Sequence, residues 1–255
     1  MCLLLISYKV HPGYPLIIAA NRDEFYNRPT EKAHFWKNHP ELLAGRDLEA
    51  GGTWLGVTKS GRFAAVTNYR DMRTLKDKAE SRGELVTNFL LSGHSPPKFG
   101  HRLSNKRKDY NGYNLLFTDM VSLYYFSNQI NKPQKLQKGI YGLSNHLLDT
   151  PWQKVLKGKE AFIKVTAEEK VLIDDLFKIL SDDKEAPEDQ LPDTGLPVEL
   201  EKVISPVFVK SERYGTRAST ILLINKVNDV LFIEKSLDTK LNKWEESRFE
   251  FKLEL

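Results

Sequence analysis

The only cysteine of this chain is its second residue, Cys2. If Met1 is removed, as often happens before a small residue, Cys2 carries a thiol and a free α-amine together. The usual pKa values, about 8.5 for a thiol and about 7.7 to 8.0 for an α-amine, allow proton exchange near neutral pH. An amine that serves an adjacent nucleophile is an established route to covalent catalysis. The alternative is a small hydrophobic residue in a buried strand, which position alone favours.

Charged residues that could assist such a nucleophile follow a second apolar run. Residues 16–20 are apolar, and Arg22 and Asp23 come directly after them within Asn21-Arg22-Asp23-Glu24. Far along the chain, Arg217 begins a buried run of residues. An arginine there is costly unless it faces a carboxylate or a ligand, and Asp23 is a possible partner.

Two asparagines at predicted strand ends are candidate oxyanion donors. Asn68 ends the strand predicted over 62–68, and Asn145 follows the strand predicted over 139–144. A carboxamide in this position can donate to a developing oxyanion, although asparagine more often caps or turns the chain.

Several other kinds of site are not supported by the spacing of their residues. The glycine-punctuated segment 44–56 lacks the following Lys-Ser/Thr of a P-loop and a helix start, so we interpret it as a turn and site wall. Ser144 lacks the Gly-x-Ser-x-Gly pattern of a nucleophile elbow. One cysteine and six scattered histidines form no zinc-like cluster, and no metal site is predicted.

Composition indicates a soluble globular protein. The 255 residues carry 38 basic and 34 acidic side chains, and a formal charge of +4 does not imply binding to nucleic acid or membrane. A basic run that contains Arg102, Lys106, Arg107 and Lys108 could attract an anionic ligand, although such a run is more often a solvated face. One cysteine excludes an intrachain disulfide framework, and the sequence shows neither a secretory signal nor a transmembrane-length segment. We expect a cytoplasmic protein.

Periodicity and turn signals predict alternating groups of strands and helices. Strands are expected over residues 3–6, 16–20, 53–58, 62–68, 113–118, 122–127, 139–144, 207–210, 218–225, 230–235 and 248–253. Helices are expected over residues 81–91, 151–165 and 168–180, with part of the polar stretch up to residue 108 also helical. Residues 25–38 and 182–196 are expected to be loops.

Seven motifs together resemble the NRDE family, which includes the transport and Golgi organisation protein 2. They extend from residue 1 beyond residue 217, so the resemblance covers nearly the whole chain. The motifs are Met1-Cys2, Asn21-Arg22-Asp23-Glu24, Gly51-Gly52-Thr53-Trp54-Leu55-Gly56, Thr67-Asn68-Tyr69, Arg82-Gly83-Glu84-Leu85, Tyr141-Gly142-Leu143-Ser144-Asn145 and Tyr214-Gly215-Thr216-Arg217.

The resemblance implies an N-terminal-nucleophile hydrolase fold and a set of site residues. Bile salt hydrolases and penicillin V acylases use an N-terminal cysteine, an Arg/Asp pair, two asparagines and a late arginine. In those acylases two residues separate the arginine and the aspartate of the pair, whereas here the two are adjacent. Which of Asn21, Asp23 and Glu24 contacts the amine is therefore left open. The matching residues in this chain are Cys2, Arg22, Asp23, Asn68, Asn145 and Arg217.

We therefore expect an α+β fold in one domain over residues 1–255, a four-layer αββα sandwich of two mostly antiparallel sheets flanked by helices. The first functional hypothesis is a hydrolase that cleaves an amide or thioester, such as an N-acyl or acyl-CoA-like substrate, through an acyl-Cys2 intermediate. Arg22, Arg217 and the amine are expected to favour the thiolate of Cys2. No cofactor is expected to be required.

The second hypothesis is an intracellular carrier that uses the same cleft for haem, acyl-CoA or lipid, as the resemblance suggests. Haem would then be a carried ligand, although the sequence contains no haem-ligand motif. In either case the expected partner is a small molecule and not nucleic acid, and no membrane span is expected.

Overall fold

The computed structural model describes residues 2–254, so the removal of Met1 considered above lies outside the described residues. The chain forms two compact units. Unit 1 comprises the residues up to Asn27, Lys138–Ser144 and Leu148–Glu250, and unit 2 comprises Arg28–Gln137, Asn145–Leu147 and the residues from Phe251. The single domain expected over 1–255 stays a prediction.

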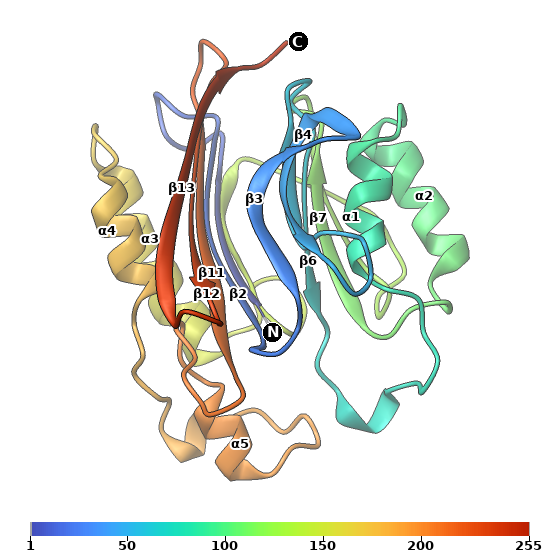
Figure 1. Cartoon of the computed structure of the whole chain (residues 1–255), viewed down its shortest axis with the longest axis vertical. Helices are drawn as coiled ribbons and strands as arrows, with labels where there is room; N and C mark the ends of the chain where they lie inside the picture. Colours follow the sequence, from blue (N-terminus) through green and yellow to red (C-terminus); the bar gives the residue numbers. More distant parts are fainter. Residues whose placement is uncertain (1, 255) are drawn as a thin grey trace. The chain divides into compact units, whose positions relative to one another are not determined.

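Unit 1 is built on a six-stranded antiparallel sheet (Figure 1). The strands predicted over residues 3–6 and 16–20 are confirmed, and they pair as an antiparallel hairpin. This hairpin lies inside the sheet, where every residue from Cys2 to Tyr8 and from Leu16 to Asp23 is buried. Strands buried on both faces read as continuous apolar runs, which explains the two runs in the sequence. In spatial order the strands are β10 (Gly139–Leu143), β1 (Cys2–Tyr8), β2 (Leu16–Phe25), β11 (Tyr214–Ile224), β12 (Asp229–Asp238) and β13 (Lys243–Lys252).

Two helices cover one face of this sheet, α3 (Gln153–Ala167) and α4 (Ile173–Leu180) (Figure 1). Alternate residues of the hairpin, such as Leu3 and Ile17, share a buried core with Phe162 and Leu176 of these helices. Complete burial of one such side chain contributes about 1.5–3 kcal/mol, so this core holds the hairpin firmly. After α4 come a 3₁₀ helix, η2 (Glu188–Gln190), and α5 (Val198–Val203).

Unit 2 is built on a seven-stranded antiparallel sheet. The expectation of a loop over residues 25–38 is wrong, because Thr30–Trp36 forms an edge strand. Only Ala33 and Trp36 of that strand are buried, so its sequence shows charged residues and no apolar run. In spatial order the strands are β3 (Thr30–Trp36), β4 (His39–Asp47), β5 (Leu55–Thr58), β6 (Phe63–Asn68), β7 (Tyr113–Thr118), β8 (Leu123–Ser127) and β9 (Gln134–Leu136).

The helices of unit 2 are α1 (Gly83–Leu90) and α2 (Pro96–Lys106), preceded by the 3₁₀ helix η1 (Met72–Thr74). Both cover one face of this sheet, α1 against β5, β6 and β7 and α2 against β8 (Figure 1). Phe89 of α1 and Phe99 of α2 pack edge to face on each other and on Phe117 of β7. Pro96 and Pro97 are the first two residues of α2. Proline is well tolerated there, because the first N–H groups of a helix have no partner within the helix.

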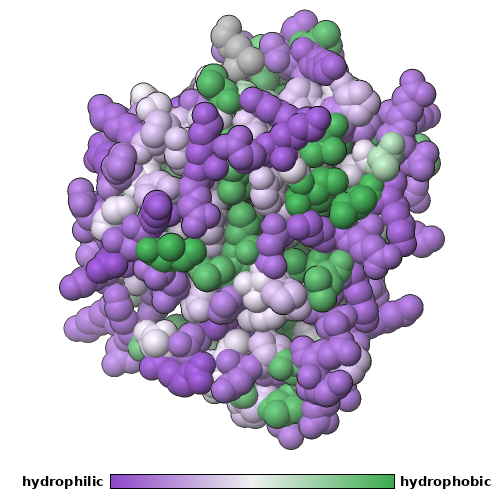
Figure 2. Space-filling view, turned by 180° about the vertical axis from the view of Figure 1, so that it is seen from behind, coloured by the Kyte–Doolittle hydropathy of each residue, from purple (hydrophilic) through white to green (hydrophobic). Residues whose placement is uncertain are grey.

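The predicted α+β class with two antiparallel sheets and accompanying helices is confirmed. The strand expected over 207–210 is wrong, because that segment makes only an isolated bridge from Lys210 to Gly215. Within residues 2–254 no helix is both long and apolar enough to cross a membrane. The face shown in Figure 2 is mainly hydrophilic, with its hydrophobic residues in separate patches.

Candidate active site around Cys2

Cys2 is the first residue of β1 and lies opposite Arg22 of β2 in the antiparallel register. Its side chain is 7% exposed. The Ser144 hydroxyl donates a hydrogen bond to the Cys2 carbonyl oxygen at 3.0 Å. The end of the hairpin therefore places the thiol beside a guanidinium, on a backbone that is held from both sides.

Arg22 is buried, and its charge is balanced on its own strand. A guanidinium nitrogen of Arg22 lies 3.7 Å from a carboxylate oxygen of Glu24. Alternation along a strand puts residues 22 and 24 on one face and Asp23 on the other. Arg22 thus faces the same side of the sheet as Cys2, its cross-strand partner.

Asp23 lies on the helix-covered face and is 2% exposed. The Thr216 hydroxyl donates to its carboxylate at 2.7 Å, and the Tyr214 hydroxyl donates to its backbone carbonyl at 3.0 Å. Burial raises the pKa of Asp23, and the positive charge of the buried Lys154 on α3 lowers it. A lysine that sequence reasoning missed is therefore the electrostatic partner of this carboxylate.

Arg217 is the extra residue of a β-bulge. Thr216 pairs with Asp23 and Ala218 pairs with Arg22, so Arg217 has no opposite residue on β2. Bulges often redirect a side chain next to a functional site. The guanidinium of Arg217 is 6% exposed and donates to the Phe25 carbonyl oxygen at 3.2 Å. The bulge is therefore what brings the late arginine to the end of β2.

Asn21 is occupied by structural hydrogen bonds. Its amide nitrogen donates to the carbonyl oxygens of Leu180 and Val207 at 2.7 and 2.8 Å, and its oxygen accepts from Ser219 at 2.7 Å. These bonds tie β2 to the end of α4 and to β11. Because Asn21 is fully used and Glu24 pairs with Arg22, Asp23 is the acidic side chain whose charge acts on the thiol.

The expected stabilisation of the Cys2 thiolate is not found in the chain that carries Met1. Burial raises the pKa of the Cys2 thiol, and the negative charge of Asp23 raises it further. The Arg22 guanidinium and a hydrogen bond from the Asp23 backbone lower it by less. The cause is desolvation, which outweighs one arginine in a site this deeply buried.

The two candidate asparagines both belong to unit 2 and contact each other. The Asn145 side-chain nitrogen donates to the Asn68 carbonyl oxygen at 3.1 Å, and the Arg70 N–H donates to the Asn145 carbonyl oxygen at 2.7 Å. Asn145 is fully buried. Within residues 2–254 the side-chain amide of Asn68 makes no hydrogen bond, so it is free to donate to a ligand.

A buried asparagine that sequence reasoning missed anchors the segment that carries Asn145. Asn114 of β7 donates to the His146 carbonyl oxygen at 2.9 Å and to the Thr67 hydroxyl at 3.1 Å, and it accepts from Tyr125 at 2.8 Å. These contacts fix the turn after β10. Among the described residues no group of three or more His, Cys, Asp or Glu side chains could hold a metal ion.

A family model described as Transport and Golgi organisation 2 matches residues 1–239. The chain belongs to this family. Homologues from Mus musculus and Homo sapiens, named Transport and Golgi organization 2 homolog and Transport and Golgi organization protein 2 homolog, are 37% and 38% identical over 280 residues. In both cases the match covers 100% of this chain and of the relative. The Drosophila melanogaster Transport and Golgi organization protein 2 is 31% identical, over 93% of this chain and 92% of its own.

Among solved structures, a conjugated bile acid hydrolase mutant from Clostridium perfringens is similar with a TM-score of 0.48 and 11% identity. The match covers 99% of this chain and 97% of that chain. A Caenorhabditis elegans orthologue of N-acylethanolamine-hydrolyzing acid amidase gives a TM-score of 0.43 and 9% identity, over 87% of this chain and 92% of that chain. At these scores the similarities carry no inference about activity.

Within this Transport and Golgi organisation 2 family member, a sequence signal for Lys154 was present. Lys154, Gly158, Phe162 and Thr166 recur every four residues and are all buried, so they form one stripe on α3. A lysine at the head of an apolar stripe needs a buried counter-charge. The identity of that counter-charge, Asp23, depends on tertiary packing and was not predictable from spacing.

Proposed function

We propose that this protein is a cysteine hydrolase that cleaves an amide or thioester through an acyl-Cys2 intermediate. The observation that carries the proposal is the surroundings of Cys2. The only cysteine of the chain lies opposite a buried arginine and beside a buried aspartate, at the end of a strand that is otherwise apolar. Burying charges costs free energy, and a cysteine that merely fills space does not require them.

The reaction proceeds in two steps. The Cys2 sulfur attacks the carbonyl carbon of the substrate, and its proton passes through a base to the leaving nitrogen or sulfur as the C–N or C–S bond breaks. Water then attacks the acyl-Cys2 thioester, which releases a carboxylic acid and restores the thiol. Because burial raises the thiol pKa, attack requires a base at the moment of reaction. In the processed protein the α-amine of Cys2 serves as that base.

The neighbouring residues have distinct roles in this proposal. Asp23 and Arg22 orient the amine and the sulfur, and Arg217 adds positive charge near the end of β2. Asn68 and Asn145 are proposed to stabilise the oxyanion and position the amine, as the family resemblance implies. Loss of one oxyanion donor usually lowers kcat by about 10²-fold to 10³-fold, and we expect this from Asn68→Ala.

The decisive experiment is to trap the intermediate. Purified protein, whose intact mass first establishes whether Met1 is absent, is mixed with a panel of acyl-CoA thioesters and N-acyl amides. Acylation adds the mass of the acyl group to the protein. Because Cys2 is the only cysteine, a hydroxylamine-sensitive adduct is a thioester at this residue. We expect the adduct and turnover in wild type, and neither in Cys2→Ala.

Binding measurements with the same proteins distinguish the hydrolase from a carrier. Cys2→Ala should bind substrates within a few-fold of wild type, because the attacking atom contributes mainly to the transition state. A carrier would instead show saturable binding of haem or acyl-CoA that survives Cys2→Ala, with no Cys2-dependent turnover across the panel. That result, or activity in protein that retains Met1, would contradict the mechanism.

A further inference from the structure

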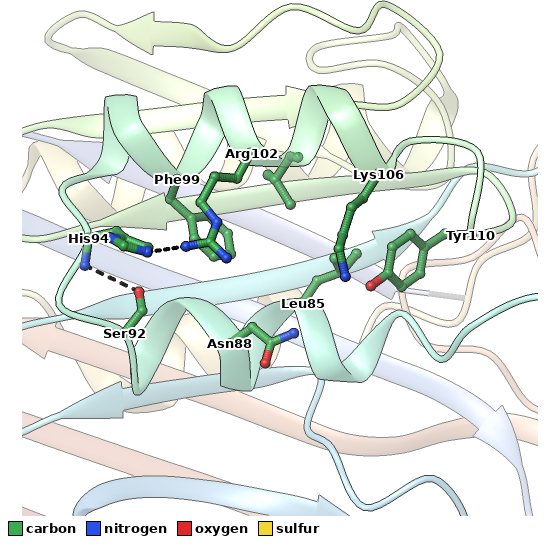
Figure 3. A pocket seen from close by; sticks show the side chains of 9 residues that line it. Leu85, Asn88, Ser92, His94, Phe99, Arg102, Lys106 and Tyr110 are labelled. Carbon is green, nitrogen blue, oxygen red and sulfur yellow. Dashed lines mark hydrogen bonds between the residues drawn. The ribbon is translucent and has the colours of Figure 1, made fainter.

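A pocket lies wholly within unit 2, between α1 and α2 (Figure 3). Its volume is about 210 Å³. The buried side chains of Leu85, Phe99 and Leu103 form an apolar floor. Pockets for drug-sized ligands usually measure about 300–1,000 Å³, so this pocket accommodates a smaller molecule.

Two cationic side chains border the pocket. Arg102 and Lys106 are one helical turn apart on α2, and both extend toward α1, where Asn88 faces them (Figure 3). Within residues 2–254 neither cation forms an ion pair with a carboxylate. A helix face with two unpaired cations over an apolar floor has the chemistry of a site for an amphipathic anion.

The side chain that contacts Arg102 does not offset its positive charge. Its guanidinium contacts the His94 ring, and the imidazole accepts this hydrogen bond on Nε2. Partial burial together with the charges of Arg102, Lys98 and Arg62 lowers the pKa of His94. The imidazole is therefore neutral at physiological pH and leaves the guanidinium charge uncompensated.

Tyr110 lines the other end of the pocket, and the described residues of the lining include no carboxylate (Figure 3). The Tyr110 hydroxyl donates to the carboxylate of Glu84, and burial together with Glu84 and Glu80 raises the pKa of Tyr110 far above its usual value. The Tyr110 hydroxyl therefore stays protonated and uncharged where it lines the pocket. An anion would avoid these carboxylates and lie between Arg102 and Lys106.

We propose that this pocket binds a small organic anion, a phosphate or carboxylate joined to a compact apolar group. The anionic group contacts Arg102 and Lys106, and the apolar group covers Phe99, Leu85 and Leu103. This site is independent of the Cys2 chemistry, since none of the residues that line it has a role in the proposed reaction.

The test is calorimetric titration of the full chain with phenyl phosphate, benzoate, inorganic phosphate and neutral benzyl alcohol. We expect saturable binding of at least one of the two aromatic anions, and much weaker binding of inorganic phosphate and benzyl alcohol. The double variant R102Q/K106Q should lower affinity by about tenfold or more, because it removes both charged donors to the anion. The matched control R107Q/K108Q removes the same charge from the adjacent residues, which do not line the pocket, and should bind like wild type.

A methyl NMR spectrum recorded during the titration supplies a second readout. Signals of Leu85 and Leu103 should shift with the bound aromatic anion. The proposal is overturned if R107Q/K108Q weakens binding as much as R102Q/K106Q, because net charge alone would then explain the affinity. It is also overturned if inorganic phosphate binds as tightly as phenyl phosphate, or if no anion of the panel saturates.

Discussion

Lys154 is 4% exposed and lies beside a carboxylate that is 2% exposed, Asp23. Removing one member of a buried pair leaves the other charge uncompensated, which costs about 3–5 kcal/mol. We therefore expect Lys154→Met to lower the free energy of unfolding by about that amount at pH 7. Lys157→Met, which changes an exposed lysine of the same helix, should cost almost nothing. Urea unfolding of both variants measures the difference.

The pH dependence of Lys154→Met has a definite sign. Burial raises the folded-state pKa of Asp23, so its stabilising contribution is fully present below the unfolded pKa of about 3.9 and is lost as pH rises through the folded value. Without Lys154 the folded pKa rises further, and stability declines more steeply between about pH 4 and neutrality. The cost of the substitution should shrink toward pH 4. A cost that does not vary with pH would assign Lys154 a packing role only.

The thiol of Cys2 offers a second prediction for single residues. In protein that retains Met1, burial raises the thiol pKa, so the rate of alkylation by iodoacetamide should rise with pH and reach its midpoint above the usual value of about 8.5. Cys2→Ser controls for reaction at other groups. A midpoint below 8 would instead support the thiolate that the sequence predicts from the nearby arginines.

The candidate site was only partly predictable from single residues. Spacing and the family resemblance identify Cys2, Arg22, Asp23 and Arg217, which the structure brings to the same end of the sheet in unit 1. The electrostatics were not predictable, because desolvation depends on how deeply packing buries each group. The assignment of Asn21 to structural hydrogen bonds likewise depends on the path of α4.

Among the elements, β11 changes its register with β2 at Arg217. Thr216 and Ala218 already face consecutive residues of β2, so deletion of Arg217 should join two correctly paired segments. We expect this deletion to cost at most about 2 kcal/mol in thermal or urea unfolding, as typical for the loss of a few contacts. Deletion of Thr220 should unfold the protein, because a one-residue slip in a regular ladder turns buried side chains to the opposite face. Equal effects of the two deletions would contradict this register.

The glycine motif that begins at Gly51 allows the backbone to approach the first residues of α1 closely. Gly51 has a φ of 77°, and a Cβ on Gly52 would lie 2.6 Å from the Gly83 carbonyl carbon. Gly52→Ala should therefore force the backbone apart and destabilise the protein by about 1–3 kcal/mol in urea unfolding. Gly93→Ala is the matched control, since its Cβ would meet no atom within 4 Å. Equal stability of the two variants would contradict the inference that the close approach of the Gly83 backbone requires glycine at position 52.

Elements with continuous apolar or amphipathic patterns were predictable, and elements at exposed edges were not. The buried hairpin of β1 and β2 and the helices α1, α3 and α4 follow from local pattern. The edge strand β3 shows only two buried residues and lacks such a pattern. Val207 and Val209 are buried without pairing as a strand, so an apolar run alone misled the prediction there.

For the whole molecule, the sequence motifs identified the family, and the fold class followed from the arrangement of strands and helices. Neither determines a reaction, because one fold serves many functions. The two units and the chain crossings between them were not predictable, since no composition shift or linker marks residues 27–28 or 144–148.

The order of strands in unit 1 also has a consequence for biosynthesis. β2 lies between β1 and β11, yet roughly 190 residues separate Phe25 from Tyr214. At about 5–20 residues per second a ribosome needs about 10–40 s to supply the missing neighbour. Throughout that interval a largely apolar strand keeps one edge open, which invites pairing with other chains.

Nascent chains stalled after residue 213 should therefore expose residues 16–25 to protease and recruit chaperones, whereas full-length chains should protect this segment. Limited proteolysis of both on purified ribosomes measures the difference. Protection in the stalled chains would show that β2 is shielded before its partner strand exists. If the stalled chains are instead cleaved within residues 16–25, the N-terminal hairpin that carries Cys2 depends on chaperones until β11 has been synthesised.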